Sequence, residues 1–443
     1  MNESTYFDIL VDWNYWGNFQ SALKKREIYL KRVHTLISPR TALSLLGIRR
    51  AGKSSIIHLY LQQLFSDKNL EIKNSLIINL EDPRFNRQLT AQDLHQLYEV
   101  YLQNLHPTDP IIVLDEVQNV EGWERFVRYL SEAKNLRVIV TGSSSKVLDQ
   151  ELATVLTGRH VDIEVFPLTL KEILEFEAIP YDSAVMVAKN KIAIKRAFDN
   201  YFQWGGFPEI HLSGSSERKR ELLFRYFDDI IFKDLVKRFN IQEVHKLEQL
   251  ANILITNIAT LQSYNRLKTQ IGVSLDTVER FVRYFEVARM FFFLKKYEYS
   301  IGEQIRSVHK VYLIDNGFYT AKGFRFSENV GRLAENLVAI ELIKRRLALP
   351  NLELYYWRDY QQREVDFVVK LGTKVHQLIQ VCWNVSDPRT LKREVNNLLR
   401  ASQELNCNDL QIITGDYEDQ QEHLTNDVTC QIRFVPLWKF VLA

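Results

Sequence analysis

Cysteine is scarce in this sequence. The 443 residues include three cysteines, Cys382, Cys407 and Cys430, and none of them belongs to a Cys-x-x-Cys pair. A zinc ribbon needs such pairs and a disulfide framework needs an even number of cysteines, so the pattern argues against both. Unpaired thiols are typical of a reducing compartment, and we therefore expect a cytoplasmic protein.

Long apolar runs and a leader-like N-terminus are also missing. No run approaches the roughly 18 apolar residues that a membrane-spanning helix needs. Residues 1–14 contain Glu3, Asp8 and Asp12 and lack the basic start and apolar centre of a signal peptide. We therefore expect no association with a membrane.

A strong net charge of either sign is absent as well. Lysine and arginine total 57 and aspartate and glutamate total 55, which leaves a net charge of +2. Such a balance neither requires nor excludes a nucleic-acid partner, and any basic binding surface has to be local. A chain of this length with 46% hydrophobic residues is expected to form roughly two to four domains.

Short apolar runs alternate with helical patterns between residues 42 and 166. The expected strands are Ala42–Leu46, Leu76–Leu80, Ile111–Asp115, Arg137–Thr141 and Val161–Phe166. Strands that alternate with helices in this rhythm predict a parallel sheet covered by helices on both faces.

The pattern changes after this segment. Residues 167–240 are helical with a turn signal at 204–208, and residues 241–300 predict three helices followed by an aromatic strand. From residue 301 onward, a helix at 330–346 among short strands predicts a separate α/β domain. The strands expected there are Val311–Ile314, Leu352–Trp357, Glu364–Val369 and His376–Trp383.

A glycine-rich turn separates the first expected strand from a helical run. Residues 47–54 read Gly-Ile-Arg-Arg-Ala-Gly-Lys-Ser, which is the spacing of a phosphate-binding loop, or P-loop. In such a loop, peptide N–H groups and the positive end of the helix hold phosphate oxygens, the lysine reaches the β- and γ-phosphates, and the serine binds Mg²⁺. The candidate ATP-binding residues are Gly47, Arg50, Ala51, Gly52, Lys53, Ser54 and Ser55, with Arg49 and Arg50 ranked below the others.

Two acids close the strand expected at 111–115. Asp115 comes at its C-terminal end, where it can hold Mg²⁺ through water together with Ser54. Glu116 is then the natural base to orient or deprotonate the attacking water. The alternative is an acidic pair that caps a helix, but the P-loop upstream favours the catalytic interpretation.

The tips of the last two expected strands supply further candidates. Ser143 and Ser144 are placed to sense the γ-phosphate, or alternatively to cap a helix at 146–156. Arg159 lies at a loop tip, where it can act as an arginine finger toward a neighbouring subunit or serve as an ordinary surface arginine. The predicted catalytic set is therefore Lys53, Glu116, Ser143 and Arg159.

Further motifs are distributed along nearly the whole chain. They are Leu114–Gln118, Val140–Ser145, Leu156–Arg159, Phe166–Leu168, Gly205–Pro208, Tyr312–Gly317, Gly331–Leu337, Tyr356–Arg358, Glu364–Phe367 and Ile379–Cys382. In this order the sequence resembles the prokaryotic AAA-type ATPases whose C-terminal half is a domain of unknown function with a restriction-endonuclease-like core. The resemblance implies an α/β protein with four parts: an AAA-type P-loop parallel sheet with an N-terminal helical segment (1–166), a helical lid (167–240), a winged-helix module (241–300) and a restriction-endonuclease-like α/β domain (301–443).

The expected winged helix carries one candidate recognition helix, in residues 274–290. Its apolar residues at helical spacing are Leu275, Val278, Val282 and Phe285. Thr277, Arg280 and Arg283 fall on the other side, where a recognition helix meets phosphates and base edges, and they are the candidate DNA contacts. Acidic residues share this helix, so a module used for packing or protein contact remains the alternative.

The nuclease-like domain lacks part of the chemistry that its fold implies. Such nucleases use a helix carboxylate, a strand aspartate and a Glu-x-Lys pair to hold a metal and support the attacking water. Glu335 and Asp366 match the first two positions, whereas Gln380 and Cys382 replace the pair. An amide is a poor ligand for a hard cation and a thiol carries no positive charge. We therefore predict a degenerate domain kept for binding or assembly, in which Glu335 and Asp366 are structural partners of Arg358 or Arg332.

Three functions are compatible with these features. The first is an ATP- and Mg²⁺-dependent ATPase that couples hydrolysis to DNA binding or remodelling as a homo-oligomer. The second is a nucleotide-gated switch that binds a protein partner and does not act on DNA. The third, an ATP-regulated nuclease, is disfavoured by Gln380 and Cys382. Two short basic runs, at 218–220 and 344–346, are more typical of solvated helix faces than of a nucleic-acid track.

Overall fold

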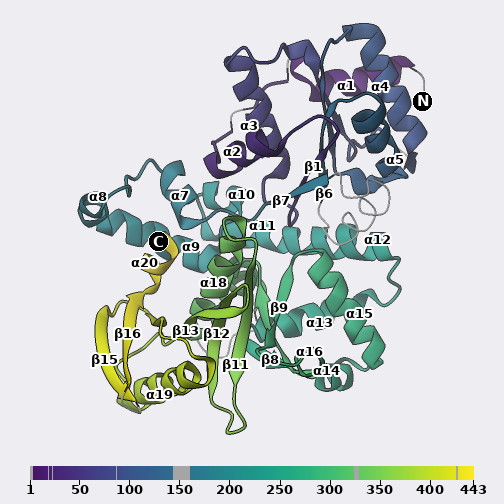
Figure 1. The fold of residues 1–443 in the computed structure, drawn as a ribbon. Helices are drawn as coiled ribbons and strands as arrows, with labels where there is room; N and C mark the ends of the chain where they lie inside the picture. The colour runs from purple at the N-terminus through teal and green to yellow at the C-terminus, as the bar shows by residue number, and fades with distance from the viewer. Residues whose placement is uncertain are drawn as a thin grey trace. The chain divides into compact units, whose positions relative to one another are not determined.

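The chain folds into two compact units (Figure 1). The computed structural model describes residues 3–17, 19–21, 23–85, 87–142, 160–323, 329–425 and 428–443. One unit comprises Met1–Phe166 with Val287–Arg289, and the other comprises Pro167–Glu286 with Met290–Ala443. None of the described helices is long and apolar enough to cross a membrane.

A five-stranded parallel sheet forms the centre of the first unit. Its strands run in the order β2, β4, β6, β1, β7. Their bounds are β1 Ala42–Leu46, β2 Ser75–Asn79, β4 Ile111–Asp115, β6 Arg137–Gly142 and β7 His160–Glu164. The predicted parallel sheet is confirmed. Because β1 and β4 both flank β6 in parallel, their carboxyl ends lie at the same edge of the sheet.

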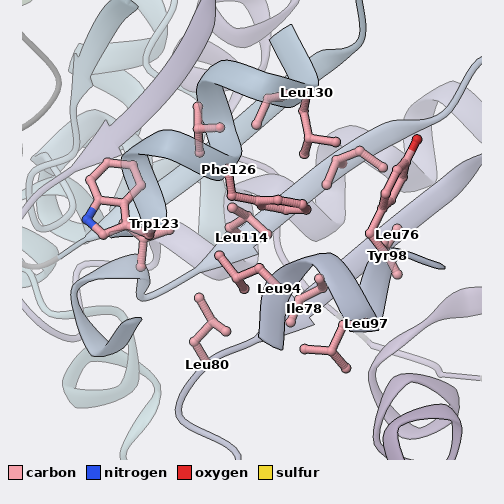
Figure 2. Close-up of a cluster of buried hydrophobic side chains, with 14 of the residues drawn as sticks. Leu76, Ile78, Leu80, Leu94, Leu97, Tyr98, Leu114, Trp123, Phe126 and Leu130 are labelled. Atoms are coloured by element: carbon pink, nitrogen blue, oxygen red, sulfur yellow. The ribbon is translucent and has the colours of Figure 1, made fainter. Parts of the chain in front are cut away.

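Helices pack around this sheet and enclose an apolar core. They are α1 (Glu3–Trp13), α2 (Glu27–Leu36), α3 (Lys53–Ser66), α4 (Ala91–Leu105) and α5 (Trp123–Arg128). Figure 2 shows Leu76, Ile78 and Leu114 from the strands facing Leu94 of α4 and Phe126 of α5. A short parallel pair, β3 (Leu89–Thr90) and β5 (Val120–Glu121), leads into α4 and α5. Burial of this core fixes the strand that carries Asp115.

The second unit begins with a helical segment. It contains α7 (Leu170–Phe176), α8 (Ala184–Lys189), α9 (Lys191–Trp204), α10 (Pro208–Leu212), α11 (Ser216–Asp229) and α12 (Lys237–Phe239). The predicted turn joins α9 to α10: Gly205 has a φ of +77°, and the Gly206 N–H donates to Asp315 Oδ2 at 2.7 Å. A side chain at position 205 would collide with Asp315, so only glycine fits this turn.

A helix, a strand, two helices and two strands follow. They are α13 (Val244–Thr256), β8 (Thr260–Gln262), α14 (Tyr264–Ile271), α15 (Leu275–Val287), β9 (Phe291–Lys296) and β10 (His309–Leu313), with α16 (Ile301–Arg306) between β9 and β10. β10 pairs antiparallel with both β8 and β9. Gly272 has a φ of +68° at the turn between α14 and α15, which L side chains rarely adopt.

These three strands continue into a nine-stranded sheet, in the order β15, β16, β14, β13, β12, β11, β9, β10, β8. The remaining strands are β11 (Leu352–Arg358), β12 (Glu364–Leu371), β13 (Lys374–Val381), β14 (Leu410–Thr414), β15 (Asp419–Thr425) and β16 (Val428–Pro436). The helices are α17 (Asn316–Lys322), α18 (Val330–Lys344), α19 (Pro388–Leu405) and α20 (Leu437–Leu442). Since β9 pairs with β11, hydrogen bonds of one sheet cross the domain boundary predicted between residues 300 and 301. The domain boundary itself stays a prediction.

Candidate functional site

The P-loop forms a tight turn between β1 and α3. Gly52 has a φ of +94° and caps α3, and Arg50 has a φ of +69°. A Cβ at position 47 would meet the carbonyl oxygen of Val165 at 2.1 Å, so glycine is required where the loop passes that backbone. The loop therefore leads directly into the N-terminus of a 14-residue helix, where free peptide N–H groups favour an anion.

Lys53 is buried at the start of α3 and points back into the loop. Its Nζ donates to the carbonyl oxygens of Gly47 at 3.1 Å and Ile48 at 3.4 Å, and lies 3.6 Å from Glu116 Oε1. The ammonium is therefore held within the turn that would surround a phosphate.

Ser54 and Asp115 meet across the strand edge. Ser54 Oγ donates to Asp115 Oδ1 at 3.0 Å and to Oδ2 at 2.8 Å, and Thr141 Oγ1 also donates to Oδ1. Burial, together with the neighbouring charge of Glu116, raises the pKa of Asp115 to about 6. The two predicted Mg²⁺ ligands thus converge, and a divalent cation beside them would offset the cost of a buried carboxylate. These residues fit Mg²⁺.

Glu116 adopts an unusual backbone conformation that turns its side chain toward Lys53. Its φ is +60°, and its peptide N–H donates to Thr141 Oγ1 at 2.9 Å. Burial raises the pKa of Glu116, but the charges of Lys53 and Arg49 outweigh that effect and hold the pKa below its ordinary value. Gln118 donates from Nε2 to Glu116 Oε2 at 2.5 Å. The carboxylate is therefore ionised, which a general base requires.

The other residues predicted for the nucleotide site differ in their burial and contacts. Ala51 is fully buried in the loop and Ser55 is half-buried on α3. Arg49 makes a bidentate pair with Glu81, at 3.1 and 2.8 Å. Ser143, Ser144, the helix expected at 146–156 and Arg159 lie outside the described residues.

Arg26 is a residue of this site that sequence reasoning missed. It is buried, and it donates to the carbonyl oxygens of Ala51 at 2.8 Å and Phe166 at 3.0 Å. The Tyr29 hydroxyl accepts from the Phe166 N–H at 3.1 Å. In the sequence, Arg26 ends a Lys-Lys-Arg run with the appearance of a solvated basic patch, and no local signal separates it from its neighbours.

The structure brings Glu335 and Asp366 together in the second unit, but their partner is a lysine rather than an arginine. Lys310 Nζ lies 2.7 Å from Glu335 Oε1, 2.7 Å from Glu364 Oε1 and 2.8 Å from Asp366 Oδ1. The predicted pairing with arginines is corrected accordingly, because β10 places a lysine there that the sequence pattern did not reveal.

Gln380 and Cys382 lie next to this cluster. Gln380 Oε1 accepts from the Asp366 N–H at 3.1 Å, and its Nε2 donates to Glu394 Oε2 at 2.9 Å. Cys382 is buried, and burial raises the pKa of its thiol to about 11. Both side chains therefore occupy structural positions as neutral groups.

Helix α15 presents two of its three predicted DNA contacts. Arg280 and Arg283 are exposed, whereas Thr277 is buried and its hydroxyl lies 2.9 Å from that of Ser274. The prediction that Thr277 shares the outer face is wrong. Ser274 caps the first turn of the helix and accepts from the Thr277 N–H at 3.1 Å. Leu275, predicted as core, is half-buried.

The two basic runs are not simple solvated faces. Lys219 is buried and donates to Asn200 Oδ1 at 2.7 Å. Lys344 is buried as well, 2.9 Å from the Tyr201 hydroxyl and 3.2 Å from Glu341 Oε1. Lys219 therefore bonds a half-buried amide, whereas Lys344 contacts a buried hydroxyl and a buried carboxylate.

Family comparisons agree with this geometry in the first unit. Residues 39–174 match the family model described as an AAA domain, while residues 195–327 and 330–433 match two domains of unknown function, DUF8612 and DUF4143. The fold and the P-loop together define a nucleotide-binding AAA-type ATPase. The chain belongs to the same family as the uncharacterized protein MJ1544 of Methanocaldococcus jannaschii, to which it is 30% identical over 427 residues, or 95% of this chain and 92% of that protein.

Further relatives and solved structures are more distant. An uncharacterized protein of Haemophilus influenzae is 26% identical over 409 residues, covering 90% of this chain and 96% of its own. A DNA polymerase III gamma subunit-related protein of Thermotoga maritima has a TM-score of 0.28 at 13% identity, covering 59% of this chain and 98% of its own. The S. cerevisiae Hsp104–ADP complex has a TM-score of 0.31 at 12% identity, and the match covers 65% of this chain and 41% of that chain. Structural similarities this weak give no information about the partners of this chain.

Proposed function

We propose that this protein hydrolyses ATP with Mg²⁺ at the junction of the P-loop and β4. The observation that supports the proposal is the convergence of Lys53, Ser54, Asp115 and Glu116, which come from α3 and from the end of β4 and contact one another at 2.8–3.6 Å. A structural turn would have no need of two buried carboxylates beside a buried lysine, since unneutralised buried charge is costly.

Each side chain then has one task. The loop N–H groups and Lys53 hold the phosphates, and Lys53 gives up its contacts with Gly47 and Ile48 to do so. Ser54 and Asp115 would hold Mg²⁺, which would supply positive charge beside the phosphates. Glu116 orients the attacking water and accepts its proton. Arg26 keeps the loop in register with the strand end by binding Ala51 and Phe166.

ATP turnover measured with Mg²⁺ tests this function. We expect phosphate release that requires Mg²⁺ and disappears in EDTA. A chain that binds ATP tightly and releases no phosphate over hours, in the presence of Mg²⁺ and of any candidate DNA, would contradict hydrolysis but leave nucleotide binding intact.

We further propose that hydrolysis is coupled to DNA through α15. The order helix, strand, two helices and two strands over α13–β10, with α16 between the last two strands, supports a winged helix in which α15 would be the recognition helix. The antiparallel pairing of β10 with β9 and β8 also supports it. Arg280 and Arg283 are exposed on α15, although Asp276 and Glu279 are exposed there too. Segment 167–240 would act as a lid and 301–443 as a nuclease-like domain that shares β10 with the winged helix, and Arg159 would act across a homo-oligomer interface.

The coupling is tested by ATP turnover with a panel of duplex, forked and single-stranded DNA. We expect stimulation that weakens as salt rises and is reduced in an Arg280→Ala/Arg283→Ala variant. Arg220→Ala, which removes an exposed arginine on α11, is the matched control. The coupling is wrong if, at low salt, DNA does not change the rate of ATP turnover and ATP does not change DNA binding. A nucleotide-gated switch for a protein partner then replaces it.

A further inference from the structure

Lys310 is the centre of a buried charge cluster in the second unit. Its side chain is 3% exposed, and its Nζ lies within 2.8 Å of carboxylate oxygens of Glu335, Glu364 and Asp366. Three elements meet here, since Lys310 belongs to β10, Glu335 to α18 and the other two acids to β12. The ammonium donates to Glu364 Oε1 and Asp366 Oδ1, and Glu335 Oε1 lies at ion-pair distance.

The acids are also held from outside the cluster. Asp366 Oδ2 accepts from the Val381 N–H at 2.9 Å, and Glu335 Oε1 accepts from the Tyr312 hydroxyl at 2.7 Å. Burial lowers the pKa of Lys310, but Asp366 and Glu335 outweigh burial and place it well above the ordinary value. The lysine is therefore charged at neutral pH, and its removal would leave the buried Asp366 and the mostly buried Glu335 without this cation.

A divalent metal does not fit this arrangement as it stands. The three oxygens surround a point already occupied by nitrogen, at distances longer than the roughly 2.0–2.2 Å that Mg²⁺ or Mn²⁺ requires. Throughout the part of the chain that the structure describes, no group of three or more His, Cys, Asp or Glu side chains is arranged to hold a metal ion. Gln380, which stands where a further carboxylate ligand is expected, binds Glu394 and the Asp366 peptide instead.

We propose that Lys310 is the resident cation of this cluster and takes the place of a divalent metal among Glu335, Glu364 and Asp366. The lysine fastens β10 to α18 and β12 and thereby joins the β8–β10 part of the nine-stranded sheet to its C-terminal part. The C-terminal domain binds no metal at this cluster and cleaves no DNA. The carboxylates hold the lysine and do not catalyse.

Mn²⁺ binding to the full chain, followed by electron paramagnetic resonance and by thermal unfolding without nucleotide, tests this assignment. Every protein carries Asp115→Asn so that the nucleotide site contributes no ion. We expect the parent chain to bind no Mn²⁺ at the cluster. Lys310→Met is expected to gain about one Mn²⁺ per chain and a Tm that rises with Mn²⁺, and both gains should vanish in Lys310→Met/Asp366→Asn. Lys370→Met is the matched control, because Lys370 is a lysine of β12 that pairs with one exposed carboxylate, Glu353, at 2.8 Å.

The assignment is overturned if the parent chain binds Mn²⁺ in a way that Asp366→Asn abolishes, since Lys310 would then be displaceable. It is also overturned if folded Lys310→Met gains no Mn²⁺. Should Lys310→Met fail to fold, Lys310→Met/Glu335→Gln removes one negative charge and keeps two carboxylates, and the same outcomes apply to it. Mn²⁺ binding by the parent chain tests the assignment of Lys310 even if neither variant folds.

Discussion

The guanidinium of Arg26 joins the carbonyl oxygen of Ala51, inside the P-loop, to that of Phe166, just beyond β7. The two carbonyls lie at the turns that follow adjacent strands, since β1 pairs with β7. One buried side chain from the segment before α2 therefore sets the spacing between the phosphate-binding turn and the neighbouring strand.

Replacing Arg26 should loosen the loop. Arg26→Ala leaves two buried carbonyls without their donor, and we expect a loss of about 2–4 kcal/mol in the first unit and weaker ATP binding. Thermal unfolding with and without ATP measures both effects. Arg128→Ala removes an exposed i,i+4 pair with Glu132 and should change little. Equal Tm values for the two variants would show that Arg26 does not support the loop.

Gly47 should tolerate no side chain. In Gly47→Ala the new Cβ meets the Val165 carbonyl oxygen at 2.1 Å, so the loop or β7 must move. We expect a cost of about 2 kcal/mol or more and a large loss of ATP affinity. In Gly331→Ala the new methyl group, at the start of α18, has nothing within 4 Å, and the Tm should stay or rise. Unimpaired ATP binding by Gly47→Ala would contradict the described turn.

Lys53 should determine nucleotide affinity. Lys53→Ala removes a charged donor to phosphate, which is worth about 1.5–3 kcal/mol, so the Kd for ATP should rise about 10- to 100-fold. Isothermal titration with ATP measures the change. The exposed Lys392, on α19, supplies the control Lys392→Ala, which should bind ATP as the parent does. An unchanged Kd in Lys53→Ala would place the phosphates elsewhere.

Glu116 should separate binding from hydrolysis. Glu116→Gln keeps the shape of the side chain and its place beside Gln118 but removes the base, and kcat should fall about 100- to 10,000-fold while ATP still binds. Phosphate release and ATP titration on the same preparation give the two numbers. Turnover equal to that of the parent would exclude Glu116 as the base.

Cys382 should be inert while the protein is folded. Its pKa of about 11 leaves about one thiolate in a thousand at pH 8, and the thiolate is the reactive form. In a Cys407→Ser/Cys430→Ser variant, alkylation by iodoacetamide should be at least about 100-fold slower than in urea. Because the pKa is raised, the native rate should climb with each pH unit toward 11. Equal native and unfolded rates at pH 8 would show that the thiol is accessible.

The nucleotide site was predictable because its chemistry is local. Four apolar residues and an acid define β4, and the P-loop spacing defines the turn between β1 and α3. Because the sheet is parallel, the carboxyl ends of β1 and β4 lie at the same edge. The start of α15 after Ser274 was predictable too, but helical periodicity alone did not show that the Thr277 side chain is buried.

The sequence by itself determined the AAA-type parallel sheet and the P-loop, because each depends on neighbouring residues. Tertiary structure alone decided the partners of the buried charges. Arg26 reaches Ala51 and Phe166, and Lys310 reaches acids of α18 and β12, across long stretches of chain. Buried ions are stable only when paired, and the partner is set by which elements the folded sheet brings together, a choice that spacing along the chain does not encode.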